Sequence, residues 1–154
     1  MLTALLYGFI IAVVVFAFVW AICVRIKNYS FLDVIWSYGV LILAPLYAFW
    51  GPGDSQRKLA FTIIGCAWSF RLGTYIFLRV LHHHPQEDVR YEGLRQRWPG
   101  PAMFLAFFEL QALIVVLFSV PFLLAAWNPK SIGPLEIAGL TISCLLYTSD
   151  AADE

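Results

Sequence analysis

The chain has 154 residues, of which 61% are hydrophobic and only 13% charged, and its formal net charge is zero. A soluble domain carries about 45–50% apolar and about 25% charged residues, and a chain of this length cannot bury so much apolar surface in one small core. The composition therefore excludes an ordinary soluble domain. It indicates an all-α protein, a polytopic bundle of transmembrane helices.

Apolar runs predict where the helices lie. A membrane-spanning helix needs about 20 apolar residues, with a range of roughly 17–25. Four runs meet this length, at residues 2–24, 31–50, 59–81 and 102–127. A fifth run, residues 131–143, is too short to cross. We expect residues 1–143 to form one membrane domain of four full spans and a truncated fifth.

Lysine and arginine residues are distributed unevenly between the two sides of the expected bundle. Cytoplasmic loops carry the excess of positive charge. One side holds Arg25, Lys27, Arg79, Arg90, Arg95 and Arg97, whereas the other holds Arg57, Lys58 and Lys130. We therefore expect an integral membrane protein with its N-terminus outside and residues 82–100 in the cytoplasm.

Asp33 stands near the start of the second run and has two interpretations. Ser30 and Asp33 have the spacing of a capping box, in which the carboxylate satisfies backbone donors at a helix start. Asp33 also shares a helix face with Trp36 and Ser37, at spacings of three and four residues. In that case the three side chains line a polar cavity.

Charged groups at membrane depth are costly and mark either function or a pair. Arg71 and Tyr75 share one helical stripe, and Arg71 is expected about 15 Å from the cytoplasmic end of its helix. Glu109 and Gln111 of the fourth run are expected about 10–14 Å from the same end. We predict that Arg71 pairs with Glu109 or is hydrogen-bonded by Gln111. The alternative is that Arg71 and Tyr75 face a polar cavity.

Residues 82–100 form a long polar stretch with two interpretations. Arg90, Tyr91 and Arg95 suit a phosphate or a nucleotide, because arginine binds bidentately and an aromatic ring stacks on a base. The alternative is an amphipathic surface helix held by its own ion pairs, such as Glu92 with Arg95. No metal site is expected at the three adjacent histidines, since neighbouring helical side chains point about 100° apart.

Four stretches together resemble the bacterial steroid 5-alpha-reductase-like membrane family, domain of unknown function 1295. In order along the chain they are NYSFLDVIWSYG, WSFRLGTYIFLR, EDVRYEGLRQRW and FFELQALIVVLFSVPFLLA. The resemblance covers about residues 20–143. It implies a multi-helix membrane oxidoreductase, located in the bacterial inner membrane.

The related reductases take hydride from NADPH and reduce a carbon–carbon double bond beside a ketone in a steroid-like lipid. The resemblance implies that the cofactor enters from the cytosol and the lipid from the bilayer. A donor must polarise the enone oxygen, and Tyr75 suits this role by type and depth. Membrane methyltransferases that use S-adenosylmethionine share the general helical plan, so methyl transfer is an alternative. A membrane protein without catalytic activity is another, and no nucleic-acid partner is expected.

The end of the chain departs from the family. The family's signature R-H-P-x-Y is missing, and the resemblance assigns most of the NADPH site to the C-terminal half that carries it. The codons of residues 144–154, CLLYTSDAADE, can be written as a sequence that resembles a transposase-type sequencing adapter. We interpret residues 144–154 as translated adapter and the chain as an inactive N-terminal part of a longer protein.

Overall fold

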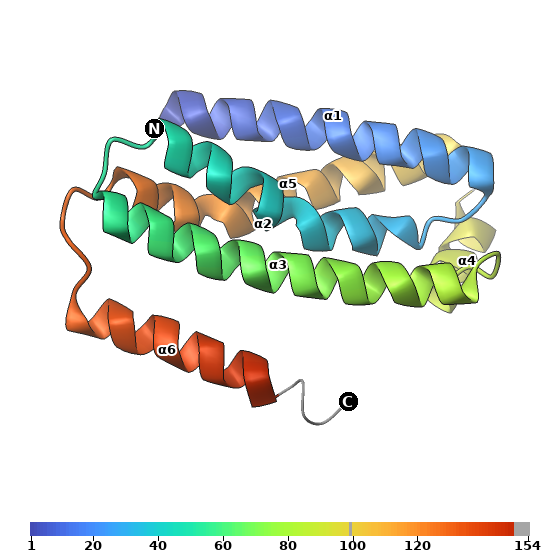
Figure 1. Ribbon diagram of the computed structural model, residues 1–154. Helices are drawn as coiled ribbons and strands as arrows, with labels where there is room; N and C mark the ends of the chain where they lie inside the picture. The colour runs from blue at the N-terminus through green and yellow to red at the C-terminus, as the bar shows by residue number, and fades with distance from the viewer. Residues whose placement is uncertain (99, 150–154) are drawn as a thin grey trace.

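The structure, a computed structural model, describes residues 1–98 and 100–149, with side chains through residue 142. Every regular element in these ranges is an α-helix. The helices are α1 (Leu2–Ile26), α2 (Phe31–Trp50), α3 (Ser55–His83), α4 (Val89–Arg97), α5 (Pro101–Trp127) and α6 (Pro134–Ser149). In Figure 1, α1, α2, α3 and α5 run side by side, while the short α4 lies at one end of the bundle, here named the α4 end.

Four helices of the described chain, α1, α2, α3 and α5, are long and apolar enough to cross a membrane. The expected all-α transmembrane bundle is thus confirmed. The α3 helix begins at Ser55, earlier than the apolar run that starts at Leu59. The reason is a cap, because the Asp54 carboxylate accepts a hydrogen bond of 2.9 Å from the backbone N–H of Arg57.

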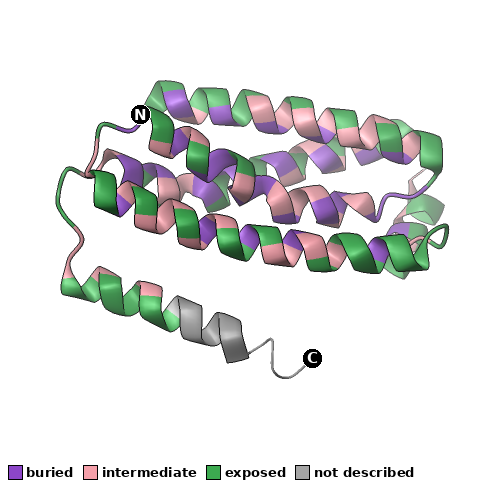
Figure 2. Ribbon diagram, viewed as in Figure 1, coloured by how far each residue is buried: buried purple, intermediate pink, exposed green. Residues whose placement is uncertain are grey.

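The core lies where α2 and α5 meet the other helices. Figure 2 shows buried residues along α2 and α5, whereas much of α1 and α3 is exposed. Many of the exposed side chains on α1 and α3 are large and apolar, including Leu6, Phe18, Ile63 and Leu78. In a bilayer such side chains face lipid, and helices meet the requirement that backbone groups be hydrogen-bonded within the chain.

Small residues let the core helices approach closely. A Cβ atom added to Gly39 of α2 would lie 2.2 Å from Val115 Cγ1 of α5. A Cβ atom added to Gly73 of α3 would lie 2.6 Å from the ring of Tyr38 in α2. Helix association in a membrane depends on this kind of packing, since lipid tails are as apolar as the side chains.

Ser69 ties α3 to α2 through the backbone of α2. Its hydroxyl donates to the carbonyl of Ser37 at 2.5 Å and accepts from the N–H of Leu41 at 3.0 Å. In a regular helix these two backbone groups would bond each other. The inserted hydroxyl therefore satisfies both groups and fixes the register of the two helices.

Arg57 fixes the connection between α5 and α6 at the opposite end of the bundle. Only 4% of Arg57 is exposed, and its guanidinium donates to the carbonyls of Lys130 at 2.8 Å and Ser131 at 3.0 Å. It also forms an ion pair with Glu136 of α6. These bonds hold the start of α6 close to α3.

The fifth predicted run needs correction. We expected a helix over residues 131–143, but α6 begins at Pro134, after carbonyls that accept from Arg57. It continues to Ser149, into the residues interpreted as adapter. The rest of that tail, residues 150–154, lies outside the described residues. With 16 residues, α6 is slightly shorter than the roughly 17–25 needed to span.

The contact between Gly39 and Val115 yields a stability prediction. Gly39→Ala should destabilise the bundle by about 1–3 kcal/mol, because the new methyl overlaps Val115 and overpacks the α2–α5 contact. Adding Val115→Ala should recover part of the loss by making room. Thermal unfolding in detergent measures both. The matched control is Gly93→Ala in α4, where no atom of the described residues lies within 4 Å of the added Cβ. Equal losses at both glycines would contradict the prediction.

Candidate functional site

The α1–α2 turn is bonded to the segment that precedes α4. Asn28 of this turn is fully buried, with 0% of the residue exposed. Its side-chain amide donates to the carbonyl of Gln86 at 3.2 Å and lies 3.4 Å from His84 Nδ1. Its side-chain oxygen accepts from the N–H of Ser30 at 3.0 Å. One asparagine therefore holds two distant loops together.

Glu87 reinforces the same junction. One carboxylate oxygen accepts from the N–H of Tyr29 at 2.5 Å, and the two oxygens accept from Arg95 at 2.9 and 3.0 Å. Arg95 also donates to the carbonyl of Lys27 at 3.1 Å. The guanidinium of Arg95 is thus bound to an internal acid and to the α1–α2 turn.

Asp33 joins α2 to α4. Its two carboxylate oxygens accept from the hydroxyl of Tyr91 and from Arg90 Nη2, each at 2.7 Å. Within the described part of the chain no side-chain hydrogen bond caps α2, and the hydroxyl of Ser30 instead accepts from the N–H of Asp88 at 2.9 Å. The capping-box interpretation of Asp33 is therefore wrong, because α4 supplies better donors than the backbone of α2.

These contacts fix the charge states at the α4 end. Burial and the carboxylate of Asp33 raise the pKa of Tyr91, so its phenol stays protonated and donates. A hydrogen bond from Arg90 lowers the pKa of Asp88, and the same bond raises the pKa of Arg90. The cluster therefore combines two carboxylates with one shared guanidinium and one neutral phenol.

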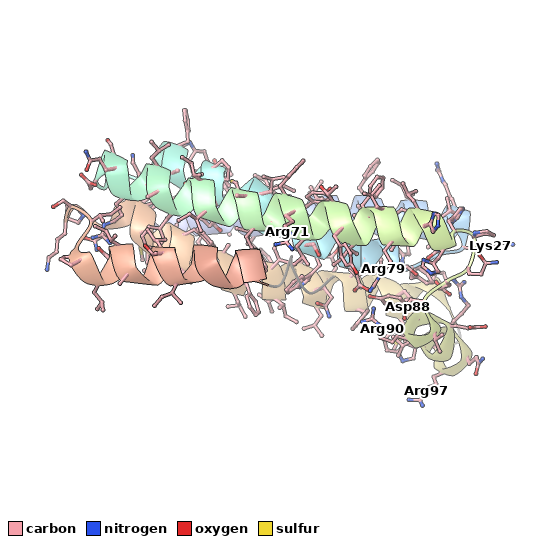
Figure 3. All side chains as sticks on the ribbon, turned by 60° about the horizontal axis from the view of Figure 1, so that its bottom comes forward. Lys27, Arg71, Arg79, Asp88, Arg90 and Arg97 are labelled. Atoms are coloured by element: carbon pink, nitrogen blue, oxygen red, sulfur yellow. The ribbon has the colours of Figure 1, made fainter. Side chains whose placement is uncertain are left out.

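A cleft opens beside this cluster, between α2, α3 and the start of α4. Its volume is about 480 Å³, within the range of roughly 300–1,000 Å³ typical of ligand sites. Figure 3 labels Arg79, Asp88 and Arg90, which gather at this end of α3 and α4. The lining residues are Asp33, Trp36, Ser37, Leu72, Ile76, Arg79, Asp88 and Arg90. The cleft therefore combines charged groups with apolar side chains.

The face that carries Asp33, Trp36 and Ser37 lines this cleft, as the second interpretation of Asp33 expected. Tyr75 does not line it, and 48% of Tyr75 is exposed on α3. Arg71 does not line it either. Arg71 and Tyr75, which were expected to face a polar cavity, are therefore not part of this cleft, because the helix turns Leu72, Ile76 and Arg79 toward it instead.

The predicted bonds to Arg71 are not formed. Among the described residues no ion pair or hydrogen bond joins Arg71 to Glu109 or Gln111. Glu109 Oε2 is buried and has no hydrogen-bond partner among the residues that the structure describes. Similar depth in two helices was therefore not enough to predict a contact, since the facing directions of α3 and α5 depend on packing.

The structure contradicts the stacking part of the nucleotide interpretation of Arg90, Tyr91 and Arg95. Tyr91 is only 4% exposed, which leaves no open ring face on which a base could stack. Both arginines are bound to internal acids. The surface-helix alternative describes α4 better, but Arg95 pairs with Glu87 rather than with the expected Glu92.

Sequence reasoning missed several residues that build this end. It did not assign a role to Asn28, Glu87, Asp88 or Arg79. A signal was present, because three of them lie in the polar starts of the stretches NYSFLDVIWSYG and EDVRYEGLRQRW. Polar triplets between apolar runs indicate loops, and two such loops can meet only where the tertiary fold brings them together.

The bond between Tyr91 and Asp33 can be tested by a double-mutant cycle. Tyr91→Phe and Asp33→Asn should each destabilise the protein, and the double variant should lose less than the sum. We expect a coupling free energy of about 1–3 kcal/mol, since a buried hydrogen bond to a charged group is lost only once. Unfolding in mixed micelles measures it, with the exposed Tyr75→Phe as control. Strictly additive losses would contradict the bond.

Comparison with known proteins places the chain in one family. A family model described as "Protein of unknown function (DUF1295)" matches residues 19–153. No curated protein and no solved structure matches. The matched range contains Asn28, Asp33, Arg79, Glu87 and the whole of α4, so it includes the cluster and the cleft. It also runs over residues 144–153, whose origin as translated adapter stays a prediction. The chain belongs to the DUF1295 family.

Proposed function

We propose that the chain is the N-terminal part of an integral membrane oxidoreductase. The proposed reaction is the NADPH-dependent reduction of a carbon–carbon double bond conjugated to a ketone, in a steroid-like or other lipid. The observation that carries the proposal is the cleft between α2, α3 and α4. The cleft combines charged side chains near the ends of the helices with apolar side chains farther along α3. A bilayer lipid has a polar head group and an apolar body, so its binding site needs both kinds of side chain.

The cleft offers only part of what NADPH requires. When bound, NADPH supplies the hydride that adds to the carbon far from the ketone. The cofactor carries several phosphate charges, but Arg90 and Arg95 are bound to acids and Tyr91 is buried. Arg79 suits a single anionic group, which is too little for the phosphates of the cofactor. The cofactor site is proposed to lie mainly in sequence that follows residue 143 in the gene.

The chain's own residues would position the lipid. Trp36 offers an aromatic surface, and its ring also packs edge-on against Phe118 with centroids 5.7 Å apart. Asp33 holds Arg90 at the mouth and so keeps α4 against α2. Tyr75, the donor suggested by its type and depth, lies outside this cleft, so the proton donor is proposed to come from elsewhere in the protein.

The reductase proposal predicts a difference between two gene products. The product extended beyond residue 143 should oxidise NADPH in membranes when an enone lipid is added, whereas the 154-residue chain should not. Absorbance of NADPH measures the rate. Asp33→Ala in the extended product should lower it at least about tenfold, because α4 loses its ion pair and its tyrosine bond. Arg97→Gln, outside the cleft, is the matched control.

Two outcomes would contradict the reductase. One is transfer of a labelled methyl group from S-adenosylmethionine to a lipid without NADPH oxidation. The other is an extended product that neither oxidises NADPH nor transfers methyl groups, which favours a protein without catalytic activity.

The proposal also places the α4 end in the cytoplasm, where NADPH is found. Single cysteines at Arg97 and Lys130, in a chain whose own cysteines are replaced by alanine, test this orientation. In spheroplasts, whose inner membrane is intact, a membrane-impermeant maleimide should label Lys130→Cys but not Arg97→Cys. Both should react after lysis. The reverse pattern before lysis would overturn the orientation.

A further inference from the structure

Arg79 differs from the other arginines at the α4 end. Its guanidinium makes no hydrogen bond or ion pair within the described part of the chain, although it lines the cleft. Arg90 and Arg95, by contrast, are bound to Asp33, Asp88 and Glu87. A guanidinium carries five N–H donors in a planar fork and cannot lose its charge in a protein. Arg79 therefore presents unused donors to the cleft.

The acids of the cleft already accept hydrogen bonds from other donors. Asp33 already accepts from Arg90 and Tyr91. Asp88 accepts from the backbone N–H and the guanidinium of Arg90. Two carboxylates and two guanidiniums leave the cleft close to neutral, so net charge alone would not attract an ion. Arg79 is itself exposed, and its planar fork matches a ligand that carries a pair of acceptor oxygens.

The lining below Arg79 is apolar. Arg79 lies about 6 Å from the end of α3 by the helical rise, whereas Ile76 and Leu72 lie about 10 and 16 Å from it. Trp36 of α2 lines the same cleft. Charged groups at the mouth and apolar groups along the membrane-spanning part of α3 match a molecule that is itself polar at one end and apolar along its length.

We propose that this cleft binds an amphiphile with an anionic head group. A phosphate or carboxylate of the head group is held by the fork of Arg79, and the apolar body lies along Leu72, Ile76 and Trp36. As a statement about the substrate of the reductase, this rests on the proposed function and narrows the substrate class to acidic lipids. As a statement about binding, it stands on the cleft alone.

Three probes separate the head group from the chain. They are 1-oleoyl-lysophosphatidate, 1-monooleoylglycerol with the same chain and no phosphate, and glycerol 3-phosphate with the phosphate and no chain. Equilibrium binding of the tritiated probes to the purified full chain in detergent, without NADPH, is the measurement. Lysophosphatidate should bind saturably and at least about tenfold more tightly than either of the others, since it alone fills both parts of the cleft.

Variants then assign the head group to Arg79. Arg79→Gln should weaken lysophosphatidate binding at least about tenfold, and Arg79→Lys should weaken it less, because lysine keeps the charge without the fork. Arg97→Gln on α4 is the matched control and should bind as the parent does. Ile76→Trp should weaken lysophosphatidate by filling the apolar part, which tests the site independently of Arg79. Size-exclusion profiles confirm that each variant is folded.

Three outcomes would overturn the proposal, and a fourth would leave it standing. Equal binding of monooleoylglycerol would mean that the head group is not recognised. Glycerol 3-phosphate or NADPH binding as tightly, with the same dependence on Arg79, would assign the arginine to a soluble phosphate. Unchanged binding by Arg79→Gln and Ile76→Trp would place the lipid elsewhere. A chain that binds lysophosphatidate while its extended product fails to oxidise NADPH keeps this site and loses only the reductase.

Discussion

The junction between the α1–α2 turn and the segment before α4 is the constraint on which the α4 end depends. Asn28 is fully buried at this junction, and a buried amide without partners would cost several kcal/mol. Its bonds to Gln86 and Ser30, with the bonds from Tyr29 to Glu87 and from Arg95 to Lys27, give these polar groups partners. The same bonds hold α4 against α2. Without that placement Asp33 would face neither Arg90 nor Tyr91, and the cleft would lack one wall.

Within the membrane-spanning part, close packing rather than the hydrophobic effect stabilises the association of the helices. Lipid does not push apolar helices together, so close packing and a few polar links decide which faces meet. Gly39 admits Val115, Gly73 admits Tyr38, and the hydroxyl of Ser69 enters the backbone of α2. These contacts settle how α3 is rotated. That rotation directs Leu72, Ile76 and Arg79 toward the cleft and leaves Tyr75 on an exposed surface.

The distribution of partners at the α4 end sets one arginine apart from the others. Arg90 donates to the carboxylates of Asp33 and Asp88, and Arg95 donates to Glu87 and to the backbone carbonyl of Lys27. Each is therefore part of the architecture. Arg79 has comparable chemistry but no such partner in the described chain, and it stands over an apolar lining. At the α4 end, the structural arginines and the arginine that faces the cleft therefore differ in which groups accept their hydrogen bonds.

The sequence by itself determined the membrane class and the four spans. The length of an apolar segment is a local property of the sequence, and the thickness of the bilayer sets the length that a spanning helix needs. The sequence also determined the family, whose four stretches lie within the matched range. It placed Asp33, Trp36 and Ser37 on one face, since helical spacing is local too. Only the tertiary structure decided that Asp33 bonds Arg90 and Tyr91 and that Arg71 does not bond Glu109. Depth along a helix follows from counting residues, but the direction a side chain faces depends on packing between helices, which no local pattern contains.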